Sequence, residues 1–211
     1  MRKKLIIVGA GGLGRIVYDV IAQNADFCRQ HDIAGFLDTR ADLELPKEIP
    51  IPLLGSPLDY RVNSDEIFIA AVGLPAWRKK LVAPLLSQGA EFFSYSSGSS
   101  IGARTSIGDG TFVTPGAVIS VDCRIGAFAY LDTYAILGHD IVLGEHCTVG
   151  AMSFLAGSVK VGDGVSIHPR ATIAKGITIG DGATIGIGSV VVKDVPAGTT
   201  VFGNPARVIF S

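Results

Sequence analysis

The stretch VKVGDGVSIHPRATIAKGITIGDGATIGIGSV, residues 159–190, places an aliphatic residue at every sixth position. A period of six fits neither an α-helix nor a simple alternating strand. It is typical of a parallel β-helix, in which each hexad forms one short strand and one corner of a prism. The same phase runs unbroken through sixteen aliphatic positions: Ile101, Ile107, Val113, Ile119, Ile125, Leu131, Leu137, Leu143, Val149, Leu155, Val161, Ile167, Ile173, Ile179, Ile185 and Val191.

Three hexads for each turn of the prism predict roughly five turns, stacked about 4.8 Å apart like neighbouring strands of a sheet. The general preference of parallel crossover connections predicts right-handed turns. The repeat stops at Pro196, and the residues beyond it are expected to cap the open end of the column. A purely structural β-helix would show the same repeat, so the repeat predicts an architecture and not an activity.

The chain before the repeat follows a different pattern. A short apolar strand at residues 5–8 is followed by a helical pattern at residues 12–23 and by a second strand at residues 33–37, which together form a βαβ opening. Another buried strand is expected at residues 67–72, followed by a helix that starts at Pro75.

The change of pattern predicts two domains, with a boundary near Ser96 in a serine-rich segment. Residues 1–96 are expected to form an α/β, Rossmann-like half domain that binds a nucleotide-sugar. Residues 97–211 are expected to form an all-β domain, a β-helix with a carboxy-terminal cap.

A glycine-rich loop, Gly9-Ala10-Gly11-Gly12-Leu13-Gly14, matches G-x-G-x-x-G directly after the first strand and opens the helix. Glycines let backbone N–H groups at a helix N-terminus approach a phosphate, and Asp38 at the end of the next strand can accept hydrogen bonds from ribose or base. A tight packing turn without a ligand is the alternative. The domain has room for about one mononucleotide half, which favours a nucleotide-sugar over NAD.

Among the polar residues of the repeat, His139 follows a glycine and precedes Asp140. An imidazole titrates near neutrality, and a neighbouring carboxylate orients it, as a general base requires. His146 and His168 are expected at the surface or at an interface. Ligands on one face of neighbouring turns should be about eighteen residues apart, and these histidines are not, so no metal site is predicted.

Composition excludes several other classes of protein. Eighteen basic and nineteen acidic residues give a net charge of −1, so there is no basic surplus for binding nucleic acid or an anionic membrane. The apolar run near the amino terminus is too short for a signal peptide or a membrane span. Three cysteines without a C-x-x-C spacing fit a reducing compartment, so we expect a cytoplasmic protein, in which Cys123 and Cys147 point inward and are structural.

The order of these motifs resembles a known family. The hexads, the Val195-Pro196 exit, the Gly203-Asn204-Pro205-Ala206 closure and the amino-terminal glycine loop are together similar to the bacterial nucleotide-sugar N-acetyltransferases of the hexapeptide-repeat family, of the bacillosamine and perosamine type. The resemblance implies a left-handed β-helix, acetyl-CoA as co-substrate and no metal. It also implies a homotrimer with active sites between subunits. The substrate would be a UDP- or GDP-linked 4-amino-4,6-dideoxy sugar for bacterial surface glycans.

The resemblance also assigns site residues by position. His139 matches the general base of the family, Asp140 matches the acidic residue beside it, and a backbone N–H such as that of Gly157 would stabilise the oxyanion. Leu13 stands where relatives frequently have histidine, and Thr148 stands where some relatives have histidine. The positions that match the nucleotide-sugar site are Gly11, Gly12, Leu13, Asp38 and Gly73, and those that match the acetyl-CoA site are Thr148, Gly157, Pro169 and Ile187.

Three other functions remain open from the sequence. The first is O-acetylation of sialic acid or a related sugar, because sialic-acid O-acetyltransferases are relatives of the same family. The second is a non-catalytic nucleotide sensor or scaffold built on a β-helix. The third is an NAD-dependent enzyme, which needs a dinucleotide crevice that the short first domain is not expected to form.

Overall fold

The computed structural model describes residues 2–210. The chain divides between Phe93 and Ser94 into two compact units. The division lies slightly before Ser96 because Tyr95 already belongs to the second unit: its N–H donates to the carbonyl of Thr111, and its carbonyl accepts from the N–H of Val113. No described helix is both long and apolar enough to cross a membrane.

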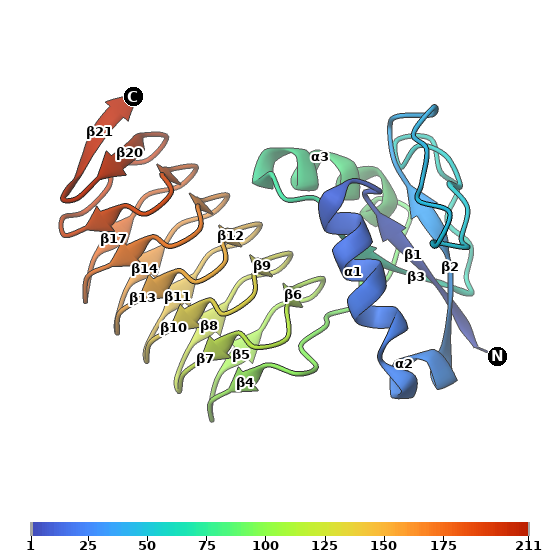
Figure 1. The fold of residues 1–211 in the computed structure, drawn as a ribbon, viewed down its shortest axis with the longest axis horizontal. Coiled ribbons are helices and arrows are strands. Elements are labelled where there is room, and N and C mark those ends of the chain that lie inside the picture. Colours follow the sequence, from blue (N-terminus) through green and yellow to red (C-terminus); the bar gives the residue numbers. More distant parts are fainter. Residues whose placement is uncertain (1, 211) are drawn as a thin grey trace. The chain divides into compact units, whose positions relative to one another are not determined.

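The first unit is a parallel three-stranded sheet in the order β2-β1-β3, with three helices (Figure 1). All four residues of the apolar run in β1 are inaccessible to solvent, as is typical of a parallel strand covered on both faces. The elements are β1 (Lys3–Val8), α1 (Gly12–Ala22), α2 (Ala25–Gln30), β2 (His31–Leu37), β3 (Glu66–Ala70) and α3 (Pro75–Leu86).

Two glycines bring α1 close against the end of β1. Gly9 has a φ of +105°, and a Cβ atom on Gly14 would lie 2.8 Å from the carbonyl carbon of Gly9. Any side chain at position 14 would therefore push the helix away from the strand. This close packing places the N-terminus of α1 at the carboxyl edge of the sheet, where ligands bind in open α/β folds.

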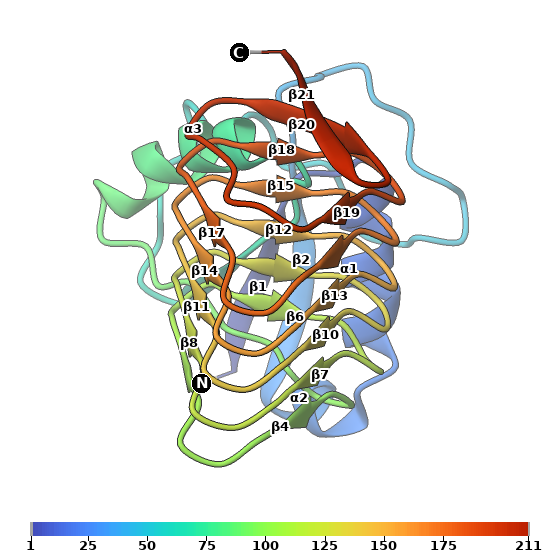
Figure 2. The ribbon, with the colours of Figure 1, turned by 90° about the vertical axis from the view of Figure 1, so that its left-hand side faces the viewer.

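The second unit is a parallel β-helix whose two-residue strands stack into three sheets. Figure 2 shows them as three sides of one column. Sheet I contains β4 (Ser100–Ile101), β7 (Val118–Ile119), β10 (Ile136–Leu137), β13 (Phe154–Leu155), β16 (Thr172–Ile173) and β19 (Val190–Val191). Sheet II contains β5 (Ser106–Ile107), β8 (Arg124–Ile125), β11 (Val142–Leu143), β14 (Lys160–Val161) and β17 (Thr178–Ile179). Sheet III contains β6 (Phe112–Val113), β9 (Tyr130–Leu131), β12 (Thr148–Val149), β15 (Ser166–Ile167), β18 (Thr184–Ile185), β20 (Thr200–Gly203) and β21 (Ala206–Phe210).

The column makes about six left-handed turns, which confirms the fold class that the family resemblance implies. The right-handed turns predicted from the general rule for parallel crossovers are wrong. That rule rests on long, twisted strands that feed a helix, whereas a two-residue strand accumulates little twist before each corner.

The core of the column is the stack of aliphatic residues that the hexads predict, and most of them are fully buried. Cys123 and Cys147 are also fully buried, as expected from their small-residue position. Their Sγ atoms lie 3.2 Å from the carbonyl oxygen of Gly138 and 3.0 Å from that of Gly162. Both cysteines therefore support the backbone at corners of the next turn.

The column does not stop at Pro196, contrary to the expectation from the repeat. Val195 pairs with Ile179 and Val201 pairs with Ile185, in each case sixteen residues along the chain instead of eighteen. Both valines are buried. The repeat continues after a two-residue deletion, which a search at fixed phase misses. The antiparallel hairpin of β20 and β21 follows this last parallel pairing.

Candidate active site

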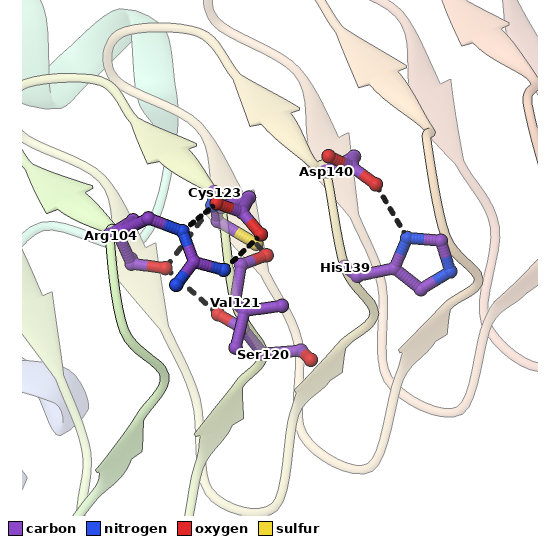
Figure 3. Close-up of polar contacts among 8 residues, drawn as sticks. Arg104, Ser120, Val121, Cys123, His139 and Asp140 are labelled. Atoms are coloured by element: carbon purple, nitrogen blue, oxygen red, sulfur yellow. Dashed lines mark hydrogen bonds and ion pairs between the residues drawn. The ribbon is translucent and has the colours of Figure 1, made fainter.

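His139 and Asp140 form the corner between β10 and β11, where sheet I meets sheet II (Figure 3). Asp140 has a φ of +58°, the left-handed conformation that turns the chain. Its N–H donates to the carbonyl of Val121 one turn earlier, at 3.1 Å, and the His139 carbonyl accepts from Ser158 one turn later, at 2.8 Å. The backbone of this corner is therefore held from both sides.

The two side chains of this corner form a close pair. The Nδ1 atom of His139 lies 2.6 Å from an oxygen of Asp140, and the two side chains are 51% and 58% exposed. With Nδ1–H donating to the carboxylate, Nε2 keeps its lone pair and faces away from Asp140. The arrangement can take a proton from a nucleophile, and the carboxylate stabilises the imidazolium that results.

Gly157 lies under the imidazole on the next turn of the column. A Cβ atom at this position would be 2.6 Å from Cε1 and 2.9 Å from Cδ2 of His139, well inside ordinary contact distance. Glycine is therefore required for the ring to lie where it does. The structure thus brings together His139 and Gly157, which stand eighteen residues apart in the sequence.

An ion pair that was not predicted from the sequence lies on the same edge, in the two turns before the histidine. Arg104 donates from Nε and Nη2 to the two oxygens of Asp122 at 2.6 and 2.7 Å (Figure 3). Arg104 and, to a smaller extent, His139 hold the pKa of the Asp122 carboxyl below its usual range. Arg104, Asp122 and Asp140 are spaced by eighteen residues, the signal by which the sequence could have revealed this column of charges.

The four positions matched to acetyl-CoA lie in three places on the column. Gly157 is at the edge between sheets I and II. Pro169 and Ile187 are stacked at the other edge of sheet I, where the carbonyl of Pro169 accepts from the N–H of Gly188 at 3.0 Å. Thr148 is half-buried on β12 of sheet III. No single edge of one column gathers all four.

The positions matched to the nucleotide lie at the carboxyl edge of the first unit's sheet. Gly11 is the N-cap of α1, with no side chain capping the helix and no acidic residue in its first turn. A Cβ atom on Gly9 would lie 2.6 Å from the carbonyl oxygen of Ala71, so the glycine loop is packed against the segment that leads to Gly73. Gly12 and Gly73 are exposed, and Leu13 is half-buried.

Asp38 is engaged by the protein itself. One oxygen accepts from the N–H of Ala10 at 2.9 Å and from Nη2 of Arg40 at 2.8 Å, and the other accepts from the backbone N–H and Nε of Arg40 at 3.0 and 2.8 Å. Each oxygen therefore already has two donors, its usual capacity. The pKa of the Asp38 carboxyl is lowered to about 2, mainly by the hydrogen bond from Arg40.

We expect Asp38→Asn to lower the free energy of unfolding by about 2 kcal/mol near neutral pH, the equivalent of the lowered pKa. Because the folded-state pKa lies below the unfolded value, the carboxylate stabilises the fold above about pH 4 and loses this effect as the pH falls toward 2. Urea unfolding of the wild type and of Asp38→Asn at several pH values measures this difference in the free energy of unfolding. The difference between them should shrink across that window, and a difference independent of pH would contradict the assignment.

The remaining histidines of the column differ in their surroundings. His168 is exposed, as expected. His146 is buried, so its expected surface position is wrong: its ring stacks on that of Phe128 one turn earlier, with centroids 5.0 Å apart and planes 7° apart. Within residues 2–210, no three side chains of the His, Cys, Asp and Glu types are grouped to hold a metal ion.

A left-handed β-helix with a histidine–carboxylate pair at a corner, preceded by an α/β unit with a glycine loop, defines a hexapeptide-repeat acyltransferase. Residues 4–85 match the PglD N-terminal domain family, and residues 158–193 match the bacterial transferase hexapeptide family (six repeats). The two models together describe a PglD-type N-terminal domain followed by a transferase hexapeptide domain, in the order expected from the sequence. The family predicted from the sequence is confirmed.

Solved structures match nearly the whole chain. The acetyltransferase domain of PglB from Neisseria gonorrhoeae, in complex with acetyl coenzyme A, is 25% identical with a TM-score of 0.87, covering 99% of this chain and 100% of that one. PerB from Caulobacter crescentus, in complex with CoA and GDP-perosamine, is 27% identical with a TM-score of 0.85, covering 97% and 96%. WeeI from Acinetobacter baumannii is 28% identical with a TM-score of 0.75, covering 98% and 100%. Comparison with curated protein sequences found no match.

Proposed function

We propose that this protein is an acetyl-CoA-dependent N-acetyltransferase. Its substrate is a UDP- or GDP-linked 4-amino-4,6-dideoxy sugar, and its product serves bacterial surface glycan synthesis. The observation that carries the proposal is the corner at which His139, oriented by Asp140, lies directly over Gly157. The full-length likeness to transferases solved with acetyl-CoA, or with CoA and GDP-perosamine, supports the choice of both substrates.

The reaction needs no covalent enzyme intermediate. The sugar nitrogen attacks the thioester carbonyl, and Nε2 of His139 takes the proton that the nitrogen loses. The backbone N–H of Gly157 stabilises the oxyanion of the tetrahedral intermediate. When the intermediate collapses, the C–S bond breaks, the imidazolium returns the proton to the CoA thiolate, and the amide remains on the sugar. Asp140 stabilises the imidazolium between these two transfers.

We further propose a homotrimer in which acetyl-CoA lies between neighbouring columns. The outer face of sheet I and its corner with sheet III carry exposed apolar side chains, an arrangement typical of a subunit interface. Contact between copies would cover these side chains and let Gly157 of one copy and the edge residues Pro169 and Ile187 of another contact one acetyl-CoA. The exposed side chains are Val118, Tyr134, Ile136, Met152 and Phe154.

We expect light scattering to give a mass of about 66 kDa in solution, three times the 22.0 kDa of one chain. Ile136→Glu places a charge at the centre of the apolar face and should lower this mass toward that of one chain. Val142→Glu, on the outer side of sheet II, is the matched control and should leave the mass unchanged. A wild-type protein that runs as a monomer at micromolar concentration would refute the trimer.

The three cysteines are free, and we place the protein in the cytoplasm, where acetyl-CoA is present and thiols stay reduced.

The substrate is tested with acetyl-CoA and a panel of acceptors. The panel contains UDP-, GDP- and dTDP-linked 4-amino sugars together with free and CMP-linked sialic acid. Release of CoA thiol only with a nucleotide-linked amino sugar supports the proposal. Turnover only with sialic acid acceptors would favour the O-acetyltransferase alternative, and no turnover with any acceptor would favour a sensor or scaffold.

A further inference from the structure

The side chain of Arg40, for which the sequence predicted no role, lies over the glycine loop of the first unit. A Cβ atom built on Gly11 would lie 3.4 Å from Nη2 of Arg40, so the guanidinium lies beside the N-cap of α1, close enough to touch a side chain there. Its side chain is 54% exposed, whereas that of Asp38 is only 9% exposed. Arg40 therefore presents the accessible charge at this loop.

Asp38 fixes how the guanidinium is oriented. The carboxylate binds the edge formed by Nε and Nη2, with both distances at 2.8 Å. An arginine has a second donor edge, formed by Nη1 and Nη2, which is suited to two-point binding of phosphate oxygens. Holding the first edge in place reduces the side-chain entropy that a ligand would otherwise have to overcome at the second.

The surrounding charges favour an anion at this place. The N-terminus of α1 carries the positive end of the helix dipole, and a cation next to it is unfavourable unless an anion joins them. Asp38 already balances the charge of Arg40, and its oxygens accept from four donors, so the attraction for an anion comes from the helix dipole and from the donors that Asp38 does not engage. A phosphate at the loop would meet the remaining guanidinium edge and the backbone N–H groups at the start of the helix together.

We propose that Arg40 binds the diphosphate of the nucleotide-sugar through its Nη1–Nη2 edge, and that Asp38 is a positioning residue that orients Arg40 and the loop. The assignment replaces the expectation from the sequence that Asp38 accepts a hydrogen bond directly from ribose or base. It rests on the proposed function, since it names the part of the acceptor nucleotide-sugar that this loop recognises. The diphosphate, and not the base, is chosen because the guanidinium lies at Gly11, where the helix begins.

Calorimetric titration with UDP, GDP, uridine and guanosine tests the assignment on the full chain. Arg40→Gln should weaken binding of whichever diphosphate the wild type prefers by about 10- to 100-fold, the size of a lost charge-assisted contact, and leave nucleoside binding unchanged. Arg40→Lys should lose less affinity for the diphosphate than Arg40→Gln, because lysine keeps the positive charge. Arg29→Gln removes an equally charged, exposed residue of the same unit and is the matched control.

Steady-state kinetics gives a second readout. Arg40→Gln should raise KM for the nucleotide-sugar and leave kcat unchanged, because Arg40 contacts no reacting atom. The Asp38→Asn variant keeps the arginine. If circular dichroism shows that it is folded, it should bind the diphosphate more weakly than the wild type. Suppose that the folded Arg40→Gln variant binds diphosphates as tightly as the wild type and still acetylates a nucleotide-sugar. This result would overturn the role of Arg40 and leave the proposed function standing. A wild type that neither binds diphosphates nor acetylates nucleotide-sugars would overturn both.

Discussion

Replacing His139 with asparagine should lower kcat by about 10²–10⁴-fold, the usual contribution of a general base. Asparagine retains a polar group of similar reach but cannot take the proton that the attacking nitrogen loses. The corner should stay folded, because its backbone is held by hydrogen bonds to Val121 and Ser158 that do not involve the imidazole. Initial rates of CoA release, measured with saturating nucleotide-sugar and acetyl-CoA, give the effect.

The matched control is His168→Asn, because His168 is an exposed histidine at another corner of the same column. It should keep wild-type kcat. Thermal unfolding of both variants verifies that the column is intact. Wild-type turnover by His139→Asn would exclude His139 as the base and return the non-catalytic β-helix to consideration.

The second large effect is expected from Gly157→Ala, a change of a single methyl group. The new Cβ atom would lie 2.6 Å from Cε1 of His139, so the imidazole has to move by about 1 Å or more. A displacement of this size costs about 10²-fold in kcat when it separates a base from its substrate. Because the ring is half exposed, it can swing toward solvent, and we expect the fold to remain stable.

Gly164→Ala is the control for Gly157→Ala. Gly164 lies at a corner of the same column and has open space where a Cβ atom would project. Its φ of +65° matches those of Arg104 and Asp122, so this backbone tolerates a side chain at a small cost. The control should keep most of its activity. Equal kcat values for Gly157→Ala and the wild type would show that the ring position over Gly157 is not needed for catalysis.

The repeat and the corner were predictable because inward packing ties each aliphatic residue to a fixed place. An eighteen-residue turn sets His139 beside Gly157, and the same spacing links Arg104, Asp122 and Asp140. A fixed period of six could not predict the shift of the repeat before Val195. The turn that contains this valine is two residues shorter than the others, so Val195 reaches the core position out of phase with the hexads.

The role of Asp38 was harder to predict for a different reason. Its place at the end of β2 follows from the βαβ pattern, and a carboxylate there can bind ribose. Whether it does depends on the other donors nearby. The side chain of Arg40, two residues further along, turns back onto both oxygens, and no sequence pattern for that contact was apparent.

The most direct test of the central claim is to follow the acetyl group itself. Wild type and His139→Asn are incubated with labelled acetyl-CoA and a UDP- or GDP-linked 4-amino sugar, and the product is treated with hydroxylamine, which cleaves esters but not amides. We expect the wild type to place a hydroxylamine-stable label on the sugar, and His139→Asn to do so at least about 100-fold more slowly. Label lost on that treatment, or equal rates for the two proteins, would contradict N-acetylation with His139 as the base.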